Sequence, residues 1–167
     1  MGRDKALVEL GGQPLVRRVA RALEAAGAMR VFVVGGDRPR IEAIGLDVVA
    51  DRFPGEGPLG GVLTAMTESE TTIVAVLATD LVAVDPAAIR AVLDALCDHD
   101  VAVPVAGGRR HFHHAVWNRS AQTRLEAAFG AGERALKRAA RSLDVVEVDG
   151  IAAAALADAD TAEELPY

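Results

Sequence analysis

The sequence predicts an α/β fold, a three-layer sandwich in which helices cover both faces of a mostly parallel sheet. Short apolar runs rich in β-branched residues alternate along the chain with longer segments whose apolar residues recur at helical spacing. Hydrophobic residues make up 51% of the chain and aromatic residues only 4%. The core is therefore built from Ala, Val and Leu, which suits helices packed closely on a sheet.

The first half of the chain supplies helices and strands in turn. Residues 15–26 carry apolar side chains at helical spacing, with Pro14 at the start and Gly27 just past the end, the usual asymmetry of helix termini. The elements predicted after this helix are a strand at 31–34, a short helix at 38–44, a strand at 46–50, a loop at 51–57 and a helix at 59–66.

The second half continues the alternation. The continuous apolar run at 72–78 predicts a central parallel strand, and Asp85 and Pro86 begin the next helix in the N-cap and N1 positions. The remaining predicted elements are a strand pair at 101–105 and 112–117 joined by a turn at Gly107-Gly108, helices at 121–129 and 134–141, and a strand at 145–148. Residues 1–167 contain no repeat and no linker, so we expect one domain.

Charge and cysteine content narrow the class of protein. The formal net charge of −6 disfavours non-specific binding to nucleic acid or to an anionic membrane surface. Cys97 is the one cysteine, which suits a reducing compartment. No apolar run reaches the roughly 18–20 residues of a membrane span, and residues 1–5 have no signal-peptide core. We expect a soluble cytoplasmic protein that binds neither nucleic acid nor membrane.

Aspartates follow several predicted strands, at the edge where open α/β sheets bind ligands. Asp51 follows the second strand, and Asp80 follows the most hydrophobic one. A carboxylate at position 80 suits Mg²⁺, which prefers a few carboxylates plus substrate phosphates. Position alone fits a turn or capping aspartate equally well.

Asp158 and Asp160 follow the last strand. Spacing of two in an extended segment directs both carboxylates to one side, which suits a shared metal. The alternative is that Asp160 or Thr161 caps a short final helix, and spacing alone favours capping. Both roles can coexist.

Two glycine-containing segments could bind phosphate. Residues 55–61 form a glycine-rich turn that runs into a helix, where the backbone can approach an anion closely. Arg3 and Lys5 precede the first helix and could neutralise a triphosphate. Taken alone, such segments are more often a simple turn and a solvated terminus.

The three histidines near residue 112 invite a metal assignment that their pattern does not support. His111, His113 and His114 have neither the i,i+4 helical spacing nor the accompanying cysteines of a zinc site, so structural or surface roles are favoured over metal binding. Cys97 lies in a predicted helix without a neighbouring base, which favours a buried cysteine without a catalytic role.

In order along the chain, these segments resemble the molybdenum cofactor guanylyltransferases and their nucleotidyltransferase relatives. The family pattern opens with a strand and a loop of the form Leu-Ala-Gly-Gly-x-Ser-x-Arg-Met-Gly-x-Asp-Lys, then a helix headed by Gly-x-Pro-Leu. The matching segments are Met1-Gly2-Arg3-Asp4-Lys5, Gly12-Gln13-Pro14-Leu15, Asp51, Gly57-Pro58-Leu59-Gly60-Gly61, Thr79-Asp80, Gly130-Ala131-Gly132-Glu133-Arg134 and Asp158-Ala159-Asp160-Thr161. Val82 departs from the pattern, which has proline there, and Asp158-x-Asp160 replaces an Asn-x-Asn pair.

The resemblance implies a Rossmann-like fold of the nucleotide-diphospho-sugar transferase type and a list of site residues. Lys5 and Asp80 would be catalytic. The nucleotide would be held by Gly2, Arg3, Lys5, Asp51, Gly57, Pro58, Gly60 and Asp80. Asp80, with Asp158 or Asp160, would ligate Mg²⁺. The reaction would be attack by a substrate phosphate on the α-phosphate of a nucleoside triphosphate, with release of pyrophosphate.

The first strand of the family pattern and the start of its loop have no counterpart in the sequence. In the family this strand lies between the strands that match residues 31–34 and 72–78. Its absence predicts two strand edges without backbone partners, at about 1–3 kcal/mol for each buried unpaired group. Either the natural chain begins upstream, with Met1 an internal methionine, or the protein is a truncated relative.

Three functions remain open. The first is transfer of GMP from GTP to molybdopterin. The second is a sister reaction, with CTP as the nucleotide or with another small phosphorylated acceptor, which Asp158-x-Asp160 keeps open. The third is a non-catalytic remnant that binds a nucleotide or a partner. The resemblance also leaves molybdoenzyme chaperones open as partners, and a monomer or a weak homo-oligomer as the assembly.

Overall fold

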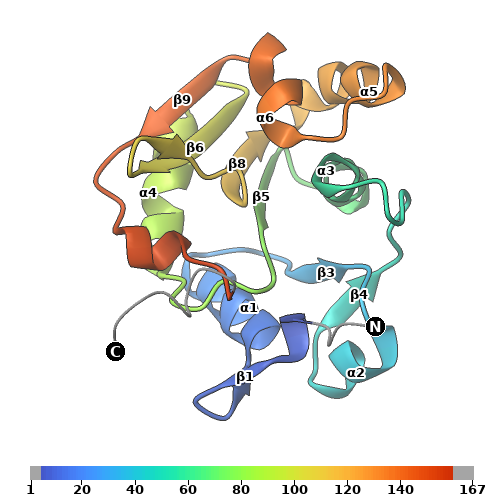
Figure 1. The fold of residues 1–167 in the computed structure, drawn as a ribbon, viewed down its shortest axis with the longest axis vertical. Coiled ribbons are helices and arrows are strands. Elements are labelled where there is room, and N and C mark those ends of the chain that lie inside the picture. The colour runs from blue at the N-terminus through green and yellow to red at the C-terminus, as the bar shows by residue number, and fades with distance from the viewer. Residues whose placement is uncertain (1–4, 160–167) are drawn as a thin grey trace.

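The computed structural model describes residues 5–159, and Figure 1 shows how their helices and strands are arranged. The helices are α1 (Leu15–Ala25), α2 (Arg38–Ala43), α3 (Pro58–Glu68), α4 (Pro86–Leu96), α5 (Gln122–Gly130) and α6 (Leu136–Ala139). The strands are β1 (Glu9–Leu10), β2 (Gln13–Pro14), β3 (Phe32–Val34), β4 (Asp47–Val49), β5 (Ile73–Leu77), β6 (Val101–Ala106), β7 (Arg109–Arg110), β8 (His114–Asn118) and β9 (Val145–Val148). Turns of 3₁₀-helix lie at Lys5–Leu7, Arg119–Ala121, Ala140–Ser142 and Ala153–Leu156.

The larger sheet has the order β5-β8-β6-β7, with β9 paired to β6. Strand β8 is antiparallel to both β5 and β6, and β9 is parallel to β6. It follows that β5, β6 and β9 run in one direction and β8 runs against them. The α/β class and a mostly parallel sheet are therefore confirmed, and the strand pair predicted around Gly107-Gly108 is present as β6 and β8.

Strand β5 lies differently in the sheet from its prediction. Its recorded partner is β8, which is antiparallel to it, and within residues 5–159 β5 is the end strand of that sheet. Strands β3 and β4 form a separate parallel sheet. The prediction of a central strand with parallel neighbours is wrong on this point, because an apolar run reports burial of two faces and not the direction of the partner strand.

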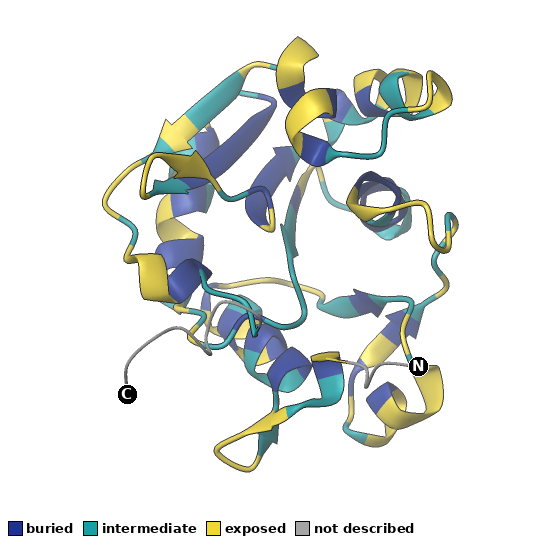
Figure 2. Ribbon diagram, in the orientation of Figure 1, coloured by how far each residue is buried: buried dark blue, intermediate teal, exposed yellow. Residues whose placement is uncertain are grey.

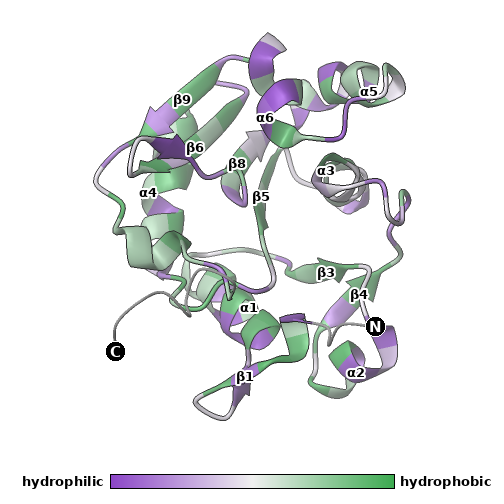
Figure 3. Cartoon of the chain, viewed as in Figure 1, coloured by the Kyte–Doolittle hydropathy of each residue, from purple (hydrophilic) through white to green (hydrophobic). Residues whose placement is uncertain are grey.

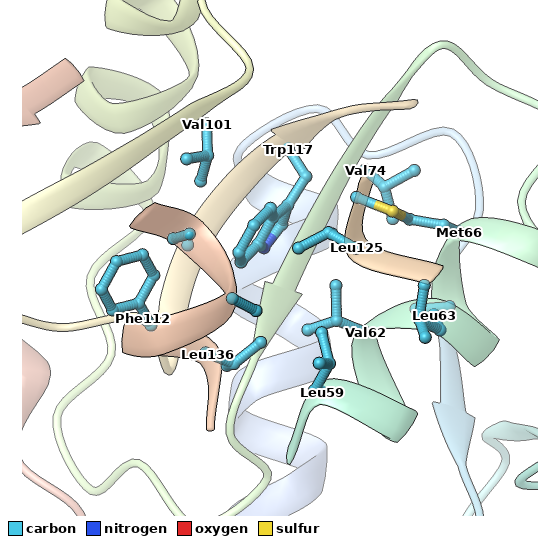
Figure 4. Packing of buried hydrophobic residues seen from close by; sticks show 14 of the residues in the cluster. Leu59, Val62, Leu63, Met66, Val74, Val101, Phe112, Trp117, Leu125 and Leu136 are labelled. Atoms are coloured by element: carbon cyan, nitrogen blue, oxygen red, sulfur yellow. The ribbon is translucent and has the colours of Figure 1, made fainter. Parts of the chain in front are cut away.

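Helices cover both faces of the larger sheet, which gives the predicted three layers. Val101, Val103 and Trp117 pack in one cluster with side chains of α3, α5 and α6 (Figure 4). The intervening Ala102 and Val116 pack on the opposite face with α4. This alternation is the period of two that strands impose on their side chains. Each helix within residues 5–159 is too short or too polar to cross a membrane.

Two local features depart from the predicted elements. Gly11 and Gly12, both at positive φ, form the two-residue loop of a hairpin between β1 and β2, which was not predicted. Helix α6 is shorter than the predicted 134–141, because the Glu133 carboxylate accepts hydrogen bonds from the Arg134 and Ala135 N–H groups ahead of it. The prediction of one domain over residues 1–167 stays a prediction.

Asp100 joins three segments at the start of β6. Its Oδ2 accepts a hydrogen bond from the Asp144 N–H at 2.8 Å, and its Oδ1 pairs with Arg124. Its own N–H donates to the Asp144 carbonyl at 3.0 Å, and its carbonyl accepts from the Asn118 N–H at 2.8 Å. The side chain is buried, so these partners replace the water that the carboxylate gives up.

Asp100→Ala is expected to lower the free energy of unfolding by about 2–3 kcal/mol, the cost of losing hydrogen bonds to a buried charged group. Glu147→Ala is the control, because Glu147 is exposed and its ion pair with Arg110 contributes at most about 1 kcal/mol. Chemical denaturation of both variants measures the difference. Equal losses would mean that Asp100 does not hold the segments together.

Candidate functional site

A cavity of about 500 Å³ lies at the carboxyl ends of β3 and β4. Its lining combines the glycines that follow β3 with the loop that follows β4: Val34, Gly35, Gly36, Arg38, Val48, Val49, Ala50, Asp51, Pro54 and Gly55. Ligands of open α/β sheets bind at such strand ends. Asp51 and Arg38 are the charged side chains in this lining, so the cavity offers one acceptor group and one cation.

The Asp51 carboxylate is fixed by its own loop. Its Oδ1 accepts hydrogen bonds from the Phe53 N–H at 2.9 Å and from Thr64 Oγ1 at 3.2 Å. Thr64 is buried in α3 and also lies within hydrogen-bond distance of the Gly60 carbonyl, so its single hydroxyl proton has two acceptors. The hydrogen bonds of Asp51 to the described residues all go to Oδ1, which leaves Oδ2 for a ligand.

The glycine-rich loop ends in α3, where Gly57 is the N-cap residue and Pro58 occupies N1. Gly57 has a φ of +81°, which other residues rarely adopt. The Leu59 N–H donates to the Arg134 carbonyl and the Gly60 N–H to the Gly57 carbonyl. These two donors, predicted to meet an anion, are therefore paired within the protein. The assignment of Gly57, Pro58 and Gly60 to the nucleotide site stays a prediction.

Gly60 has a packing role that the motif does not reveal. A Cβ atom at this position would lie 2.9 Å from Phe53 Cβ, closer than real contacts allow. Its neighbour Gly61 has nothing within 4 Å of the equivalent position. Gly60 therefore lets the loop carrying Phe53 and Asp51 pack against the first turn of α3.

Arg134 links this loop to the second glycine-rich turn, residues 130–134. Its Nε donates to Glu56 at 2.5 Å, and its Nη1 donates to the carbonyls of Phe129 and Glu133. The guanidinium lies 3.9 Å from the centroid of the Phe129 ring, which also contacts Phe53. The sequence shows this turn but not its link to the first loop, because Glu56 lies 78 residues from Arg134 along the chain.

Asp80 and Asp158 lie in adjacent segments. Leu81 and Asp158 form an antiparallel bridge, and the Val82 N–H donates to the Ala157 carbonyl at 3.1 Å. Asp80 is half-buried and lines a second cavity, between β3 and β5, that shares Val34 with the first. Within residues 5–159 no three His, Cys, Asp or Glu side chains gather as a ready-made metal site.

The other predicted residues are placed as follows. Lys5 is exposed in the first 3₁₀ turn, next to the buried Ala6. Gly2, Arg3 and Asp160 lie outside the described residues. His114 is buried against β5, and burial lowers the pKa of its imidazole below the ordinary 6.5, which agrees with the favoured structural role. Cys97 is exposed, so the expectation of a buried cysteine is wrong.

A family model described as the MobA-like NTP transferase domain matches residues 1–148. The chain belongs to this family. A molybdenum cofactor guanylyltransferase of Pseudomonas entomophila is 34% identical over 142 residues, 83% of this chain and 73% of that one. The match to a probable molybdenum cofactor guanylyltransferase of Opitutus terrae is 40% identical over 90 residues, 52% of this chain and 45% of that one. The chain spans 63% of the length of a third relative, a probable molybdenum cofactor guanylyltransferase of Pelotomaculum thermopropionicum.

Solved structures show the same fold. A protein of Aquifex aeolicus superposes with a TM-score of 0.80 at 22% identity, covering 95% of this chain and 85% of that one. Molybdopterin-guanine dinucleotide biosynthesis protein A of Archaeoglobus fulgidus gives 0.67 at 24%, covering 89% and 76%. The 2-C-methyl-D-erythritol 4-phosphate cytidylyltransferase of Thermus thermophilus gives 0.69 at 20%, covering 90% and 85%. The fold of this MobA-like domain is thus the predicted nucleotidyltransferase type.

Gly60→Ala is expected to destabilise the MobA-like domain by about 1–3 kcal/mol, because the new methyl group displaces Phe53 and the loop it anchors. Gly61→Ala is the matched control one residue along the same helix. It is expected to raise stability by about 0.5–1 kcal/mol, since it adds a better helix former in open space. Thermal and chemical unfolding measure both. Similar values for the two variants would remove the packing explanation.

The Glu133 carboxyl gives a pH dependence. Hydrogen bonds from Arg138 and from the Ala135 N–H lower the pKa of this carboxyl from 4.5 to about 2. The ionised form therefore stabilises the folded state fully above pH 4.5, and this stabilisation is lost as the pH falls toward 2. Glu133→Gln is expected to unfold at a lower temperature than the parent at neutral pH, with the difference shrinking between pH 4.5 and 2. A constant difference across that range would contradict the assignment.

Proposed function

We propose that this MobA-like domain transfers GMP from GTP to molybdopterin. A phosphate oxygen of the acceptor attacks the α-phosphorus of GTP, the bond from that phosphorus to the bridging oxygen of the β-phosphate breaks, and pyrophosphate leaves. Family membership over residues 1–148 supports the reaction class, and the names of the matching relatives support the substrates. No covalent step falls to the protein, so positioning and charge neutralisation supply the rate.

The bridge between Leu81 and Asp158 is the observation that carries the proposal, because it places the segment of Asp80 next to that of Asp158. These carboxylates come from segments joined by the bridge at Leu81, at the end of β5 where the fold binds ligands. Mg²⁺ is held by one or two carboxylates together with substrate phosphates, so the donor set fits this ion without a third protein ligand. Asp80, with Asp158 or Asp160, would hold Mg²⁺, which would supply charge neutralisation at the phosphates.

The remaining substrate contacts follow from the first cavity and the amino-terminal segment. Asp51, with Oδ1 fixed by Phe53 and Thr64, would present Oδ2 to the nucleoside. Lys5, exposed ahead of α1, would neutralise the triphosphate together with Arg3, and Gly2 would contact the phosphates. The Gly57-Pro58-x-Gly60 segment would border the nucleotide through its backbone.

A CTP-dependent reaction on the same site is the second candidate. The likeness in fold to a cytidylyltransferase and the Asp158-x-Asp160 pair support it, and base preference separates it from the first.

The proposal also includes a cytoplasmic location, molybdoenzyme chaperones as partners, and a monomer or weak homo-oligomer as the assembly. A non-catalytic remnant would bind a nucleotide without releasing pyrophosphate.

Asp80→Asn is expected to abolish the Mg²⁺-dependent thermal stabilisation by GTP and the release of pyrophosphate in the presence of molybdopterin. A ligand that binds only the folded state at a hundredfold excess over Kd stabilises by about 2.7 kcal/mol, so the shift is readily measured. Asp94→Asn, at an exposed position on α4, is the control that keeps both.

Parallel titrations with CTP, ATP and UTP identify the base. Stabilisation by CTP alone would overturn the first candidate in favour of the second. Nucleotide binding that survives Asp80→Asn, without pyrophosphate release in the parent, would favour the remnant.

A further inference from the structure

Arg18 lies on helix α1 and joins this helix to two other segments. Its Nη2 donates a hydrogen bond to the Val82 carbonyl at 3.1 Å, and its Nη1 donates a longer one to the Leu10 carbonyl at 3.4 Å. Its Nε is buried and has no hydrogen-bond partner among residues 5–159. The guanidinium is therefore enclosed between the hairpin of β1 and β2 and the loop after β5, with its two outer nitrogens bound to backbone.

The position of Arg18 follows from the amphipathic pattern of α1. The buried residues of this helix are apolar, and its arginines are half-buried or exposed (Figures 2 and 3). Residues 18, 22 and 26 recur on one side of the helix, because side chains four residues apart lie one above the other. Ala22 and Ala26 pack there with Ile89, and Val84 packs against the same cluster. Arg18 thus faces the segment that leads from β5 to α4.

That segment begins with the turn that carries Asp80. The turn lies between two points held by backbone hydrogen bonds. On one side the Ala78 N–H donates at 2.8 Å to the residue just ahead of β8, and on the other the Val82 N–H donates to the Ala157 carbonyl at 3.1 Å. Arg18 binds the remaining polar group of Val82, its carbonyl. Both backbone groups of Val82 are therefore fixed, and the second anchor of the Asp80 turn depends on Arg18.

The same anchor holds the segment that carries Asp158. Leu81 forms the antiparallel bridge with Asp158, and the carbonyl of Ala157 is the acceptor for Val82. Leu81 is 1% exposed, so its side chain packs the loop against the core. Residues 80–82 and 157–158 thus form one paired unit, and the hydrogen bond from Arg18 ties this unit to α1.

We propose that Arg18 is a positioning residue for Mg²⁺, which fixes the paired unit so that Asp80, with Asp158 or Asp160, binds the ion at low Mg²⁺ concentration. The inference rests on the proposed function, because it concerns the metal ligands assigned there. A planar guanidinium suits this task, since it donates in several directions from one rigid group. Groups that orient metal ligands without touching the ion change metal affinity or activity by about 10–100-fold when they are removed.

Arg17 provides a matched comparison one residue earlier on the same helix. Its Nη1 donates to the Gly45 carbonyl at 3.1 Å, the same kind of hydrogen bond at the same length as that of Arg18 to Val82. Gly45 lies between α2 and β4, in a segment that carries none of the predicted metal ligands. A loss of stability from removing an arginine of α1 is therefore expected in both variants, and an effect on Mg²⁺ only at Arg18.

The first test measures how much Mg²⁺ the 167-residue chain needs for its thermal stabilisation by GTP. In Arg18→Ala the Mg²⁺ concentration that gives half of the maximal shift is expected to rise by about 10–100-fold. In Arg17→Ala it is expected to match the parent. Arg18→Lys is expected to lie between the parent and Arg18→Ala, because an ammonium group donates to the Val82 carbonyl without the fork that also reaches Leu10.

Hydrogen exchange without nucleotide or metal gives a second readout. Exchange of the Val82 amide is expected to quicken by about tenfold in Arg18→Ala, because the loop loses a hydrogen bond from a charged donor. The Ala78 amide, at the other anchor of the Asp80 turn, serves as the internal reference. Arg17→Ala is expected to leave the exchange of both amides unchanged.

Two outcomes would overturn the inference: an equal Mg²⁺ requirement in Arg18→Ala and Arg17→Ala, or an unchanged exchange rate of the Val82 amide in Arg18→Ala. If Arg18→Ala does not fold, Arg18→Lys is compared with Arg17→Ala by the same two measurements. A parent chain without any Mg²⁺-dependent shift would contradict the proposed function, and the exchange of Val82 would still decide whether Arg18 holds the Asp80 turn.

Discussion

The ladder between β5 and β8 is the interaction on which most of the described structure depends. It pairs residues 73–77 with 114–118 and so ties the first half of the chain to the second. Helix α3 packs on one face of this ladder through Val74 and Trp117, and α4 packs on the other through Val116. The segment that carries Asp80 leaves the sheet from the end of the same strand. An antiparallel ladder with apolar side chains packed on both faces fixes register strongly, because a slip of one residue would move every apolar side chain to the other face.

The same strand shows why one ladder does not complete the fold. Backbone groups of a buried strand require partners on both edges, and an open apolar edge is a place where another strand adds. Among residues 5–159, one edge of β5 pairs with β8, and its other edge faces the second cavity, opposite the edge of β3 that β4 does not cover. The two cavities adjoin at Val34, so the unpaired edges and the candidate nucleotide site share a border.

The loops of the candidate site are held from outside the sheet. Arg134 joins the Phe129 ring, Glu56 and the first turn of α3, and Thr64 reaches back from that helix to Asp51. These contacts fix the loop geometry through the protein itself, which leaves the Asp51 carboxylate oriented before a ligand arrives. Pre-orientation of this kind reduces the entropy that binding would otherwise cost.

The sequence by itself determined the order and type of most elements, because hydrophobic period and terminal Pro, Gly and Asp residues are local signals. It also singled out Asp51, Asp80 and Asp158 as residues after strands. Tertiary structure decided the direction of the strand next to β5, the bridge between Asp158 and Leu81, the contacts of Arg134 and the close approach of Phe53 that explains Gly60. Each of these depends on residues far apart in the chain, and no local pattern records which distant segment supplies the partner. The separation of β3 from β5 was predicted only from the resemblance to the family pattern. An apolar strand looks the same in sequence whether one of its edges or both are paired.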